Sequence, residues 1–393
     1  MFYSAFLFSS CNAVESPKPE IPILAWFSIP EGEYTTLEQY EALRDAGFTV
    51  SYSHTSSFEG ALKALDLCAE VGIKSVFACR ELASDPEGTA LKVKDHPGLG
   101  YYFLRDEPWN SDLEALGEWA RKIESVDSDH PCYLNLFPSY VDFSADGGYR
   151  EHLRLFSEKV ALPQISFDHY PVLYEDGKIF LNGAFYENLE LVSAEARRTG
   201  KPFWAFALAT AHSTSHWHYP IPTIGHLRLQ MYSDLAYGAQ CLQYFTYWTP
   251  VGTHFDFHAA PLNADGTRSE TYYLIREFNK EIQARADVFL GCEVSKVSHI
   301  GDTIPTGTTR LENLPEGFTT LETFGKGALV SELSNAGKDY VVIQNTSPEE
   351  SIELAAGFNK KVRLVSPDGA RSARLPGSEN FVLTAGDILV FEL

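Results

Sequence analysis

The sequence predicts a (β/α)₈ barrel followed by an antiparallel β-sandwich, and three observations support this fold class. Between residues 21 and 286, short apolar or aromatic runs alternate with longer helical stretches. The eight strand–helix units match a barrel in both number and length. From residue 287 to 393 the helical period disappears, and short runs are separated by Gly, Asn and Pro turns, as in a β-sandwich. A doubly wound open sheet is the alternative, but no Gly-rich nucleotide loop follows an early strand.

The eight expected barrel strands are apolar runs that end in small, polar or aromatic residues. They cover residues 22–29, 48–54, 74–79, 98–107, 131–137, 163–169, 202–210 and 241–248. The helices expected between them cover residues 36–46, 58–71, 88–94, 111–126, 149–158, 183–199, 223–238 and 269–285. Gly72 and Gly200 follow two of these helices directly, as expected where a left-handed residue ends a helix. In the sandwich, strands are expected at 319–324, 328–333, 339–344, 361–365 and 388–393.

The amino-acid composition indicates which classes of ligand the protein could bind. The net charge of −22 argues against nucleic acid and against an anionic membrane surface, but not against a neutral sugar. The many aromatic residues suit the stacking surfaces that sugars require. The six cysteines show neither metal-binding spacing nor a dense disulfide framework. We therefore expect a carbohydrate substrate and no cofactor.

Residues 1–20 resemble an export segment and linker. A short apolar run leads through small residues to Cys11, as in a bacterial lipoprotein signal, although no basic residue precedes it. The run is too short to span a bilayer. We expect an exported protein, periplasmic or anchored to the outer membrane of a Gram-negative bacterium through lipid on Cys11. An apolar tail without this role is the alternative.

The end of the fourth expected strand carries the strongest functional signal. The aromatic run 101–104 continues into Arg105, Asp106 and Glu107, and Pro108 then ends the strand. Two carboxyl groups at the end of a buried strand are costly to desolvate unless they have partners or a chemical role. The structural alternative is an Arg105–Asp106 ion pair with an acid that caps the next helix.

Other strand ends supply polar and aromatic residues to the same face of the predicted barrel, where barrel enzymes hold their active sites. The candidate substrate-binding residues are Trp26, His54, Arg80, Asn135, His169, Tyr170, His212, Tyr247 and Trp248. Several have structural alternatives: Trp26 as a core residue, Arg80 as a partner of Asp106, and Asn135 as a loop anchor. Because strand residues alternate in direction, at most one of Tyr247 and Trp248 points into the barrel.

This combination suits glycoside cleavage, which needs an acid for the leaving oxygen and a second group for the oxocarbenium-like transition state. Glu107 is the candidate acid, because aromatic neighbours would raise the pKa of its carboxyl group. Asp168, at the end of the sixth strand, is the next candidate carboxylate.

Four barrel segments, at residues 105–108, 133–138, 165–171 and 243–250, resemble those of barrel glycoside hydrolases of gut Bacteroidetes. Residues 385–391 resemble part of the accessory β domain of such enzymes. The resemblance implies an acid/base Glu after strand 4, usually preceded by Asn, and a nucleophilic Glu after strand 7. Here Asp106 precedes Glu107, and residues 202–211 contain no carboxylate.

Three interpretations fit this departure. Asp106 and Glu107 could act as the adjacent pair of hexosaminidases that use the acetamido group of the substrate as nucleophile. Glu107 and Asp168 could instead form a catalytic pair, or the protein could bind sugar without cleaving it. A metal-dependent barrel hydrolase is a further alternative, because His216 and His218 form an H-x-H pair. That pair lies in a long loop, so no metal site is predicted.

Overall fold

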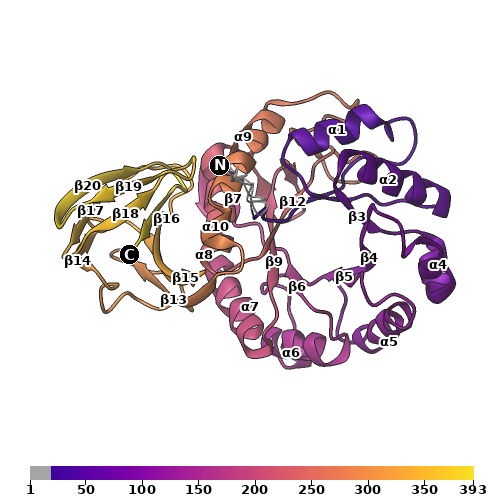
Figure 1. Ribbon diagram of the computed structural model, residues 1–393, viewed down its shortest axis with the longest axis horizontal. Coiled ribbons are helices and arrows are strands. Elements are labelled where there is room, and N and C mark those ends of the chain that lie inside the picture. The colour runs from indigo at the N-terminus through magenta and orange to yellow at the C-terminus, as the bar shows by residue number, and fades with distance from the viewer. Residues whose placement is uncertain (1–18) are drawn as a thin grey trace, which may run out of the picture.

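The computed structural model describes residues 19–393, and the predicted export segment with Cys11 falls almost entirely outside them. Eight parallel strands form a barrel, as the sequence predicts (Figure 1). The ring closes between the fifth and sixth strands through a bridge from Leu136 to Phe167. Its strands are β1 (Ile23–Trp26), β2 (Val50–Tyr52), β3 (Lys74–Phe77), β4 (Leu99–Asp106), β5 (Cys132–Asn135), β6 (Ile165–Phe167), β9 (Phe203–Leu208) and β12 (Cys241–Phe245).

The predicted helices surround the barrel, one after each strand. They are α1 (Leu37–Asp45), α2 (Phe58–Val71), α4 (Pro86–Val93), α5 (Leu113–Glu124), α6 (Tyr149–Lys159), α7 (Phe185–Thr199), α8 (Ile224–Ala236) and α9 (Glu270–Ala284). The short helices α3 (Arg80–Ser84) and α10 (Ala286–Phe289) were not predicted. Gly72 and Gly200 end their helices with φ of 74° and 67°, the left-handed conformation that glycine adopts without steric cost.

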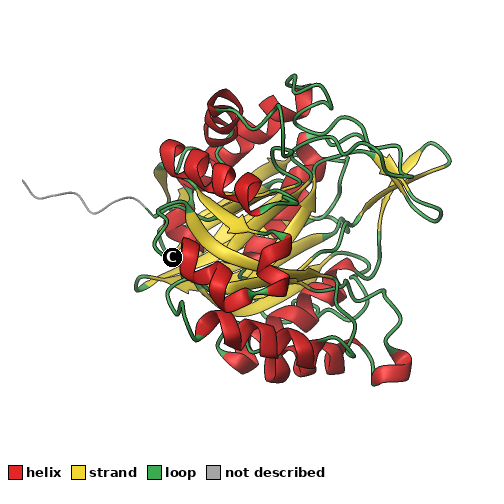
Figure 2. Ribbon diagram, turned by 90° about the vertical axis from the view of Figure 1, so that its right-hand side faces the viewer, coloured by secondary structure: helices red, strands yellow, loops and turns green. Residues whose placement is uncertain are grey.

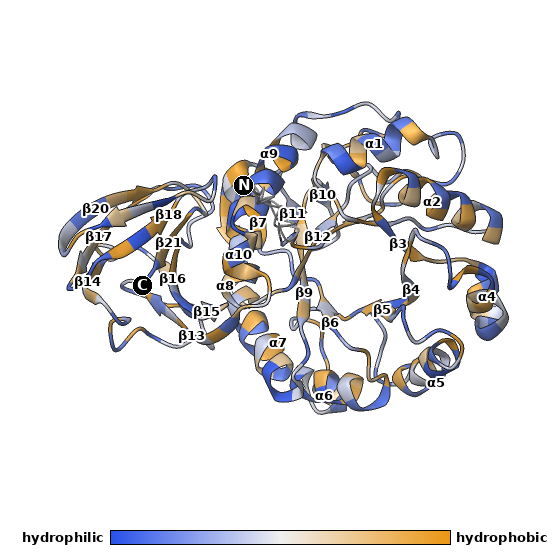
Figure 3. Ribbon diagram, in the orientation of Figure 1, coloured by the Kyte–Doolittle hydropathy of each residue, from blue (hydrophilic) through white to orange (hydrophobic). Residues whose placement is uncertain are grey.

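The outer helices are amphipathic, and Figure 3 shows polar and apolar residues along each of them. In α5 the buried residues Leu113, Leu116, Ala120 and Ile123 recur at helical spacing and face the barrel. In contrast, α8 is buried on nearly every side. It lies between the barrel and the C-terminal sheets, so it has no solvent-facing stripe.

Two hairpins extend the loops that follow β6 and β9, and neither was predicted (Figure 2). The first pairs β7 (Val172–Glu175) with β8 (Lys178–Leu181), and the second pairs β10 (His212–Ser213) with β11 (His218–Tyr219). Their strands are too short to show a reliable alternating pattern in the sequence.

The C-terminal part is an antiparallel sandwich around its own apolar core. One sheet contains β13 (Glu293–Ile300), β15 (Ala328–Asn335), β16 (Lys338–Asn345), β21 (Ile388–Glu392), β18 (Val362–Val365) and β19 (Arg371–Arg374). The other contains β14 (Phe318–Glu322), β17 (Ile352–Phe358) and β20 (Gly377–Leu383). Strands β13, β17, β19 and β20 were missing from the prediction.

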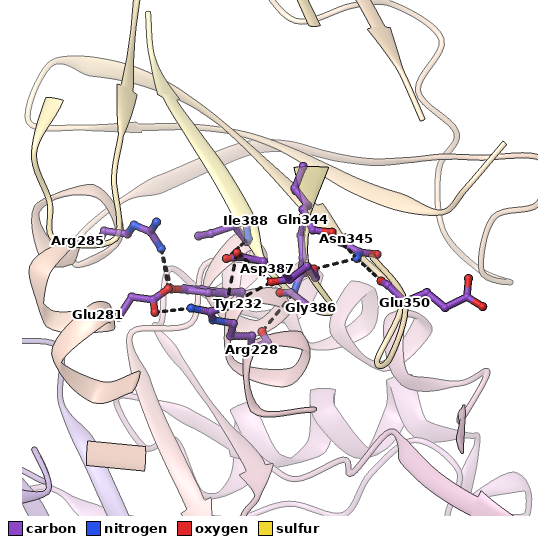
Figure 4. Close-up of polar contacts among 12 residues, drawn as sticks. Arg228, Tyr232, Glu281, Arg285, Gln344, Asn345, Glu350, Gly386, Asp387 and Ile388 are labelled. Carbon is purple, nitrogen blue, oxygen red and sulfur yellow. Dashed lines mark hydrogen bonds and ion pairs between the residues drawn. The ribbon is translucent and has the colours of Figure 1, made fainter. Parts of the chain in front are cut away.

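A buried polar network joins the sandwich to the barrel (Figure 4). Arg285 donates to the Tyr232 hydroxyl at 2.7 Å and to the Ser366 carbonyl at 3.1 Å. Gln344 donates to the Leu229 carbonyl at 2.9 Å and accepts from Ser233 at 2.8 Å. These bonds satisfy polar groups that the domain contact removes from water.

The cysteines at positions 68, 79, 132, 241 and 292 are free thiols. Within residues 19–393, no helix is both long and apolar enough to cross a membrane.

Candidate active site

A β-bulge in β4 turns Asp106 toward the barrel axis. Phe103 pairs with Tyr133 inside the barrel, but the register then shifts, so that Arg105 pairs with Leu134 and Asp106 with Asn135. The extra residue moves Asp106 from the helix-facing side of the strand to the inner side. Arg105 points outward and lies 3.6 Å from Asp112, so the expected Arg105–Asp106 ion pair is wrong.

Glu107 has a backbone conformation that few residues other than glycine adopt. Its φ is 46°, while its amide still donates to the Asn135 carbonyl at 2.8 Å. Residues next to each other in a strand normally face opposite sides. The left-handed turn at Glu107 breaks this alternation. Its carboxyl group stays close enough to Asp106 for the charge of that residue to raise the pKa of Glu107. Such strain in a non-glycine residue is concentrated at functional sites.

Asn135 connects the carboxylates of two strands. Its amide nitrogen donates to Asp168 at 2.8 Å and, more weakly, to Asp106 at 3.4 Å. Asn135 and Asp168 are buried, with 3% and 7% of their surfaces exposed. The ends of β4, β5 and β6 therefore bring Asp106, Glu107 and Asp168 into one cluster.

The pKa of every carboxyl group in this cluster is raised. Glu107 is half-buried, and burial together with the charge of Asp106 raises its pKa to about 7. Solvent reaches Asp106 at the open end, but the surrounding protein raises its pKa to about 6, while the Asn135 amide acts in the opposite direction. Burial and the charges of Glu107 and Asp106 raise the pKa of Asp168 well above its ordinary value. At neutral pH the cluster therefore holds at least one proton.

Aromatic side chains surround the carboxylates. Tyr170 packs against Phe245 and Tyr219, with ring centroids 5.6 Å and 6.1 Å apart. His212 stacks on Tyr219 at 4.6 Å. Tyr170 lies close enough to all three carboxyl groups for their charges to raise the pKa of its hydroxyl, although burial is the largest cause.

Sequence reasoning missed three residues of this lining. Tyr140, in the loop after β5, lies near Asp168 and contacts the ring of His169 at 5.0 Å. Tyr219 lies in an unpredicted hairpin, and Phe245 precedes the two aromatics that the sequence analysis selected on the eighth strand. The aromatic run at residues 244–248 indicated that this strand end carries aromatic side chains, but the sequence did not show that Phe245 is the one that lies beside Tyr170.

Trp26 and His54 lie below and beside the cluster. Trp26 is 2% exposed and contacts Tyr52, Phe103 and Phe206 in the barrel interior, so it is a core residue rather than a sugar-stacking platform. His54 is exposed and stacks on Phe27 at 4.4 Å. Its ring remains available to a ligand.

Neither Arg80 nor His169 makes a hydrogen bond or ion pair with a carboxyl group of the cluster among the described residues. Arg80 begins α3 and is exposed, and its charge acts on Glu31 rather than Asp106. His169 is 1% exposed and bonds Asn188 at 2.9 Å. Burial lowers the pKa of His169 and of His212 to about 4, so both rings are neutral at pH 7.

Tyr247 and Trp248 do not point into the barrel mouth. Tyr247 is fully buried against Phe48, in the core between the barrel and its helices. Trp248 is 5% exposed and packs on Tyr34 at 4.9 Å. Neither ring therefore has a free face on which a sugar could stack in this structure, whereas Phe245 is half-buried and packs on Tyr170.

The seventh barrel strand, β9, contributes no acid, as its sequence indicates. Among residues 19–393, no group of three or more His, Cys, Asp and Glu side chains is arranged to hold a metal ion. The chemistry available at this end of the barrel is therefore that of three carboxyl groups, one amide and an aromatic wall.

Comparisons with known proteins agree with the fold. Residues 120–285 match the family model Glyco_hydro_42, described as beta-galactosidase. The structure resembles the beta-galactosidase of Bacillus circulans sp. alkalophilus with a TM-score of 0.63, at 10% identity, over 95% of this chain and 99% of that one. The beta-galactosidase of Halorubrum lacusprofundi gives a TM-score of 0.52 at 12% identity, covering 94% and 99%.

The beta-galactosidase of Marinomonas ef1 gives a TM-score of 0.50 at 12% identity over 68% of this chain, which spans 60% of the length of that enzyme. No curated protein matches the sequence. Identities this low establish the barrel-and-sandwich fold alone, and the expected Bacteroidetes origin stays a prediction.

Proposed function

We propose that this chain is a glycosidase that hydrolyses β-galactosides, with Glu107 as general acid/base and Asp168 as the second carboxylate. The observation that carries this proposal is the cluster of three carboxyl groups that Asn135 joins across strands β4, β5 and β6. The choice of β-galactosides rests on the description of the matching family.

Glu107 has the properties of a general acid. A pKa of about 7 keeps a large fraction of its carboxyl group protonated at neutral pH. The Asn135 amide donates to Asp168 and Asp106, and this stabilises their ionised forms. No such donor contacts the Glu107 carboxyl among the described residues, so we assign to Glu107 the proton that is transferred.

Asp168 supplies the missing second carboxylate. With no acid on β9, the oxocarbenium-like transition state needs negative charge from another strand. The charge of Glu107 acts directly on Asp168, and a 2.8 Å hydrogen bond from Asn135 holds the carboxylate in place. In the proposed reaction the Glu107 proton passes to the leaving oxygen as the glycosidic bond breaks. Asp168 either bonds the anomeric carbon, and water then releases the sugar, or takes the proton of the water that attacks this carbon.

A second candidate is hydrolysis of N-acetylhexosaminides with the acetamido group of the substrate as nucleophile. The observation that favours it is the position of Asp106, which is adjacent to Glu107, open to solvent and also bonded by Asn135. In this mechanism Asp106 would orient the acetamido nitrogen, and Asp168 would serve only to hold Asn135.

One experiment separates the two. Aryl β-galactosides, aryl β-glucosides and aryl N-acetyl-β-hexosaminides are tested with the wild type and with the variants Asp168→Ala and Asp106→Asn. The main proposal expects β-galactoside cleavage that Asp168→Ala removes and azide partly restores. Preference for acetamido substrates, together with the larger loss in Asp106→Asn, would support the second candidate. Sugar binding without cleavage of any glycoside would leave a non-catalytic binding protein.

We also propose export and lipid anchoring through Cys11, on the pattern of residues 1–20 alone. Labelling of the protein with a palmitate analogue in a Gram-negative host, lost in Cys11→Ser, is the expected result. Unlabelled protein in the cytoplasm would contradict it.

A further inference from the structure

A chain of buried polar groups runs beneath the carboxylates, through the interior of the barrel. The Tyr133 hydroxyl donates to the Gln243 side-chain oxygen at 2.6 Å, and the Gln243 nitrogen donates to Ser166 at 2.9 Å. The Ser166 hydroxyl donates to the Asn135 oxygen at 2.9 Å, and the Asn135 nitrogen contacts Asp168. The chain thus connects strands β5, β12 and β6 to the catalytic cluster.

These groups are buried, so they must form hydrogen bonds with one another rather than with bulk water. Tyr133, Ser166 and Gln243 have no exposed surface. Packing fixes the first member, because the Tyr133 ring stacks on Trp204 at 5.5 Å. A buried polar chain persists only when each member finds a partner, because an unpaired group in a low-dielectric interior is costly.

The direction of the chain is determined by its two ends. The Asn135 nitrogen donates to a carboxyl oxygen of Asp168, so the Asn135 oxygen is turned toward Ser166. Ser166 must then donate to Asn135 and accept from Gln243. This leaves the Gln243 oxygen for the Tyr133 hydroxyl, which donates. Only this assignment of donors and acceptors satisfies every group in the chain. If any hydrogen bond is reversed, the Asn135 oxygen has no donor.

We propose that Ser166 and Gln243 are positioning residues that fix the orientation of the Asn135 amide, and through it the position and ionisation of Asp168 and Asp106. This inference rests on the proposed function for its effect on turnover. The orientation itself is a property of the free protein. Without Ser166 the Asn135 oxygen loses its only side-chain donor among the described residues, and the amide is free to rotate away from the carboxylates.

The variant Ser166→Ala tests this, with Ser166→Thr as the rescue that keeps a hydroxyl. Ser51→Ala is the matched control, because Ser51 is an equally buried barrel serine that bonds Ser28 at 2.9 Å and does not belong to the chain. We expect Ser166→Ala to lose about ten- to a hundredfold in kcat, the usual effect of a small displacement of a reacting group, with KM little changed. The acid limb of the pH profile should move to higher pH, and Ser166→Thr should restore most of both.

A substrate-free measurement separates this inference from the proposed function. The side-chain ¹⁵N signal of Asn135, identified by its loss in Asn135→Ala, is followed against pH in protein labelled at asparagine. We expect a titration in the wild type whose midpoint rises in Ser166→Ala but not in Ser51→Ala. That result supports the positioning role even if no glycoside is cleaved.

Two outcomes would overturn the inference. One is an Asn135 signal and a pH profile that do not change in Ser166→Ala, and the other is a loss of kcat in Ser51→Ala as large as that in Ser166→Ala. If Ser166→Ala does not fold, Gln243→Met is read in the same way.

Discussion

The amide nitrogen of Asn135 lies 2.8 Å from a carboxylate oxygen of Asp168, and this contact joins the ends of two neighbouring barrel strands. The same nitrogen reaches Asp106, at the end of β4, at 3.4 Å. One neutral residue therefore opposes the effect of burial, which raises the pKa of both carboxyl groups.

Replacing Asn135 with Ala should move the acid limb of the kcat/KM profile to higher pH. The amide lowers the pKa of both aspartates, so its removal raises the pH at which the second carboxylate ionises. Turnover on an aryl β-galactoside between pH 4 and 9 measures this shift. An acid limb that stays in place in Asn135→Ala would show that neither aspartate limits turnover.

Glu107→Gln should stabilise the protein at neutral pH. The folded-state pKa of Glu107 is raised to about 7 from 4.5, so the unfolded chain ionises first as pH rises. Glu107 therefore lowers the free energy of unfolding as pH rises. This loss is absent below about pH 4 and complete above about pH 7, where it is at most about 3 kcal/mol. Thermal melts at pH 4 and pH 8 should show a higher Tm for the variant only at pH 8. A gain of equal size at both pH values would contradict the raised pKa.

Tyr247→Phe should leave turnover unchanged, whereas Tyr170→Ala should reduce it. The Tyr247 hydroxyl is buried without a hydrogen-bond partner among residues 19–393, so its removal should add about 1 kcal/mol of stability. Tyr170 faces the carboxylates. Steady-state kinetics and urea denaturation measure the two effects. Loss of turnover in Tyr247→Phe would return this residue to the site.

Arg285→Ala should destabilise the protein by about 1–3 kcal/mol, because the Tyr232 hydroxyl and, across the domain contact, the Ser366 carbonyl would lose a buried donor. Glu281 keeps Arg228 as its partner. Lys326→Ala is the control, since its 2.8 Å pair with Glu350 is exposed and should change stability by less than about 1 kcal/mol. Denaturant unfolding compares the two. Equal effects would mean that the network in Figure 4 contributes no more than a surface pair.

The barrel was predictable because its strands and helices carry strong local patterns. All eight strands lie within the predicted ranges, since parallel strands buried on both faces are nearly continuous apolar runs. Strands such as β19, which reads Arg-Ser-Ala-Arg, have no such pattern. Their pairing is decided by contacts distant in sequence.

The candidate site was harder to predict, because its geometry depends on departures from regular structure. A regular β4 would have turned Asp106 toward the helices, and only the bulge reverses this. Likewise, Phe245 lies with the barrel interior, whereas Tyr247, two residues later, packs in the outer core, so the regular alternation of the strand ends after Phe245. The sequence therefore predicted which strand ends bring the carboxyl groups together, but not which aromatic side chains lie beside them.

If Glu107 donates the proton to the leaving oxygen, turnover of the Glu107→Gln variant must depend strongly on the acidity of the leaving group. Glu107→Gln is compared with the wild type on aryl β-galactosides whose phenols range from weakly to strongly acidic. Turnover should fall by about 10²–10⁴ with a poor leaving group such as unsubstituted phenol, and far less with dinitrophenol, which needs no acid. A loss of the same size across the series, or no loss at all, would contradict the assignment.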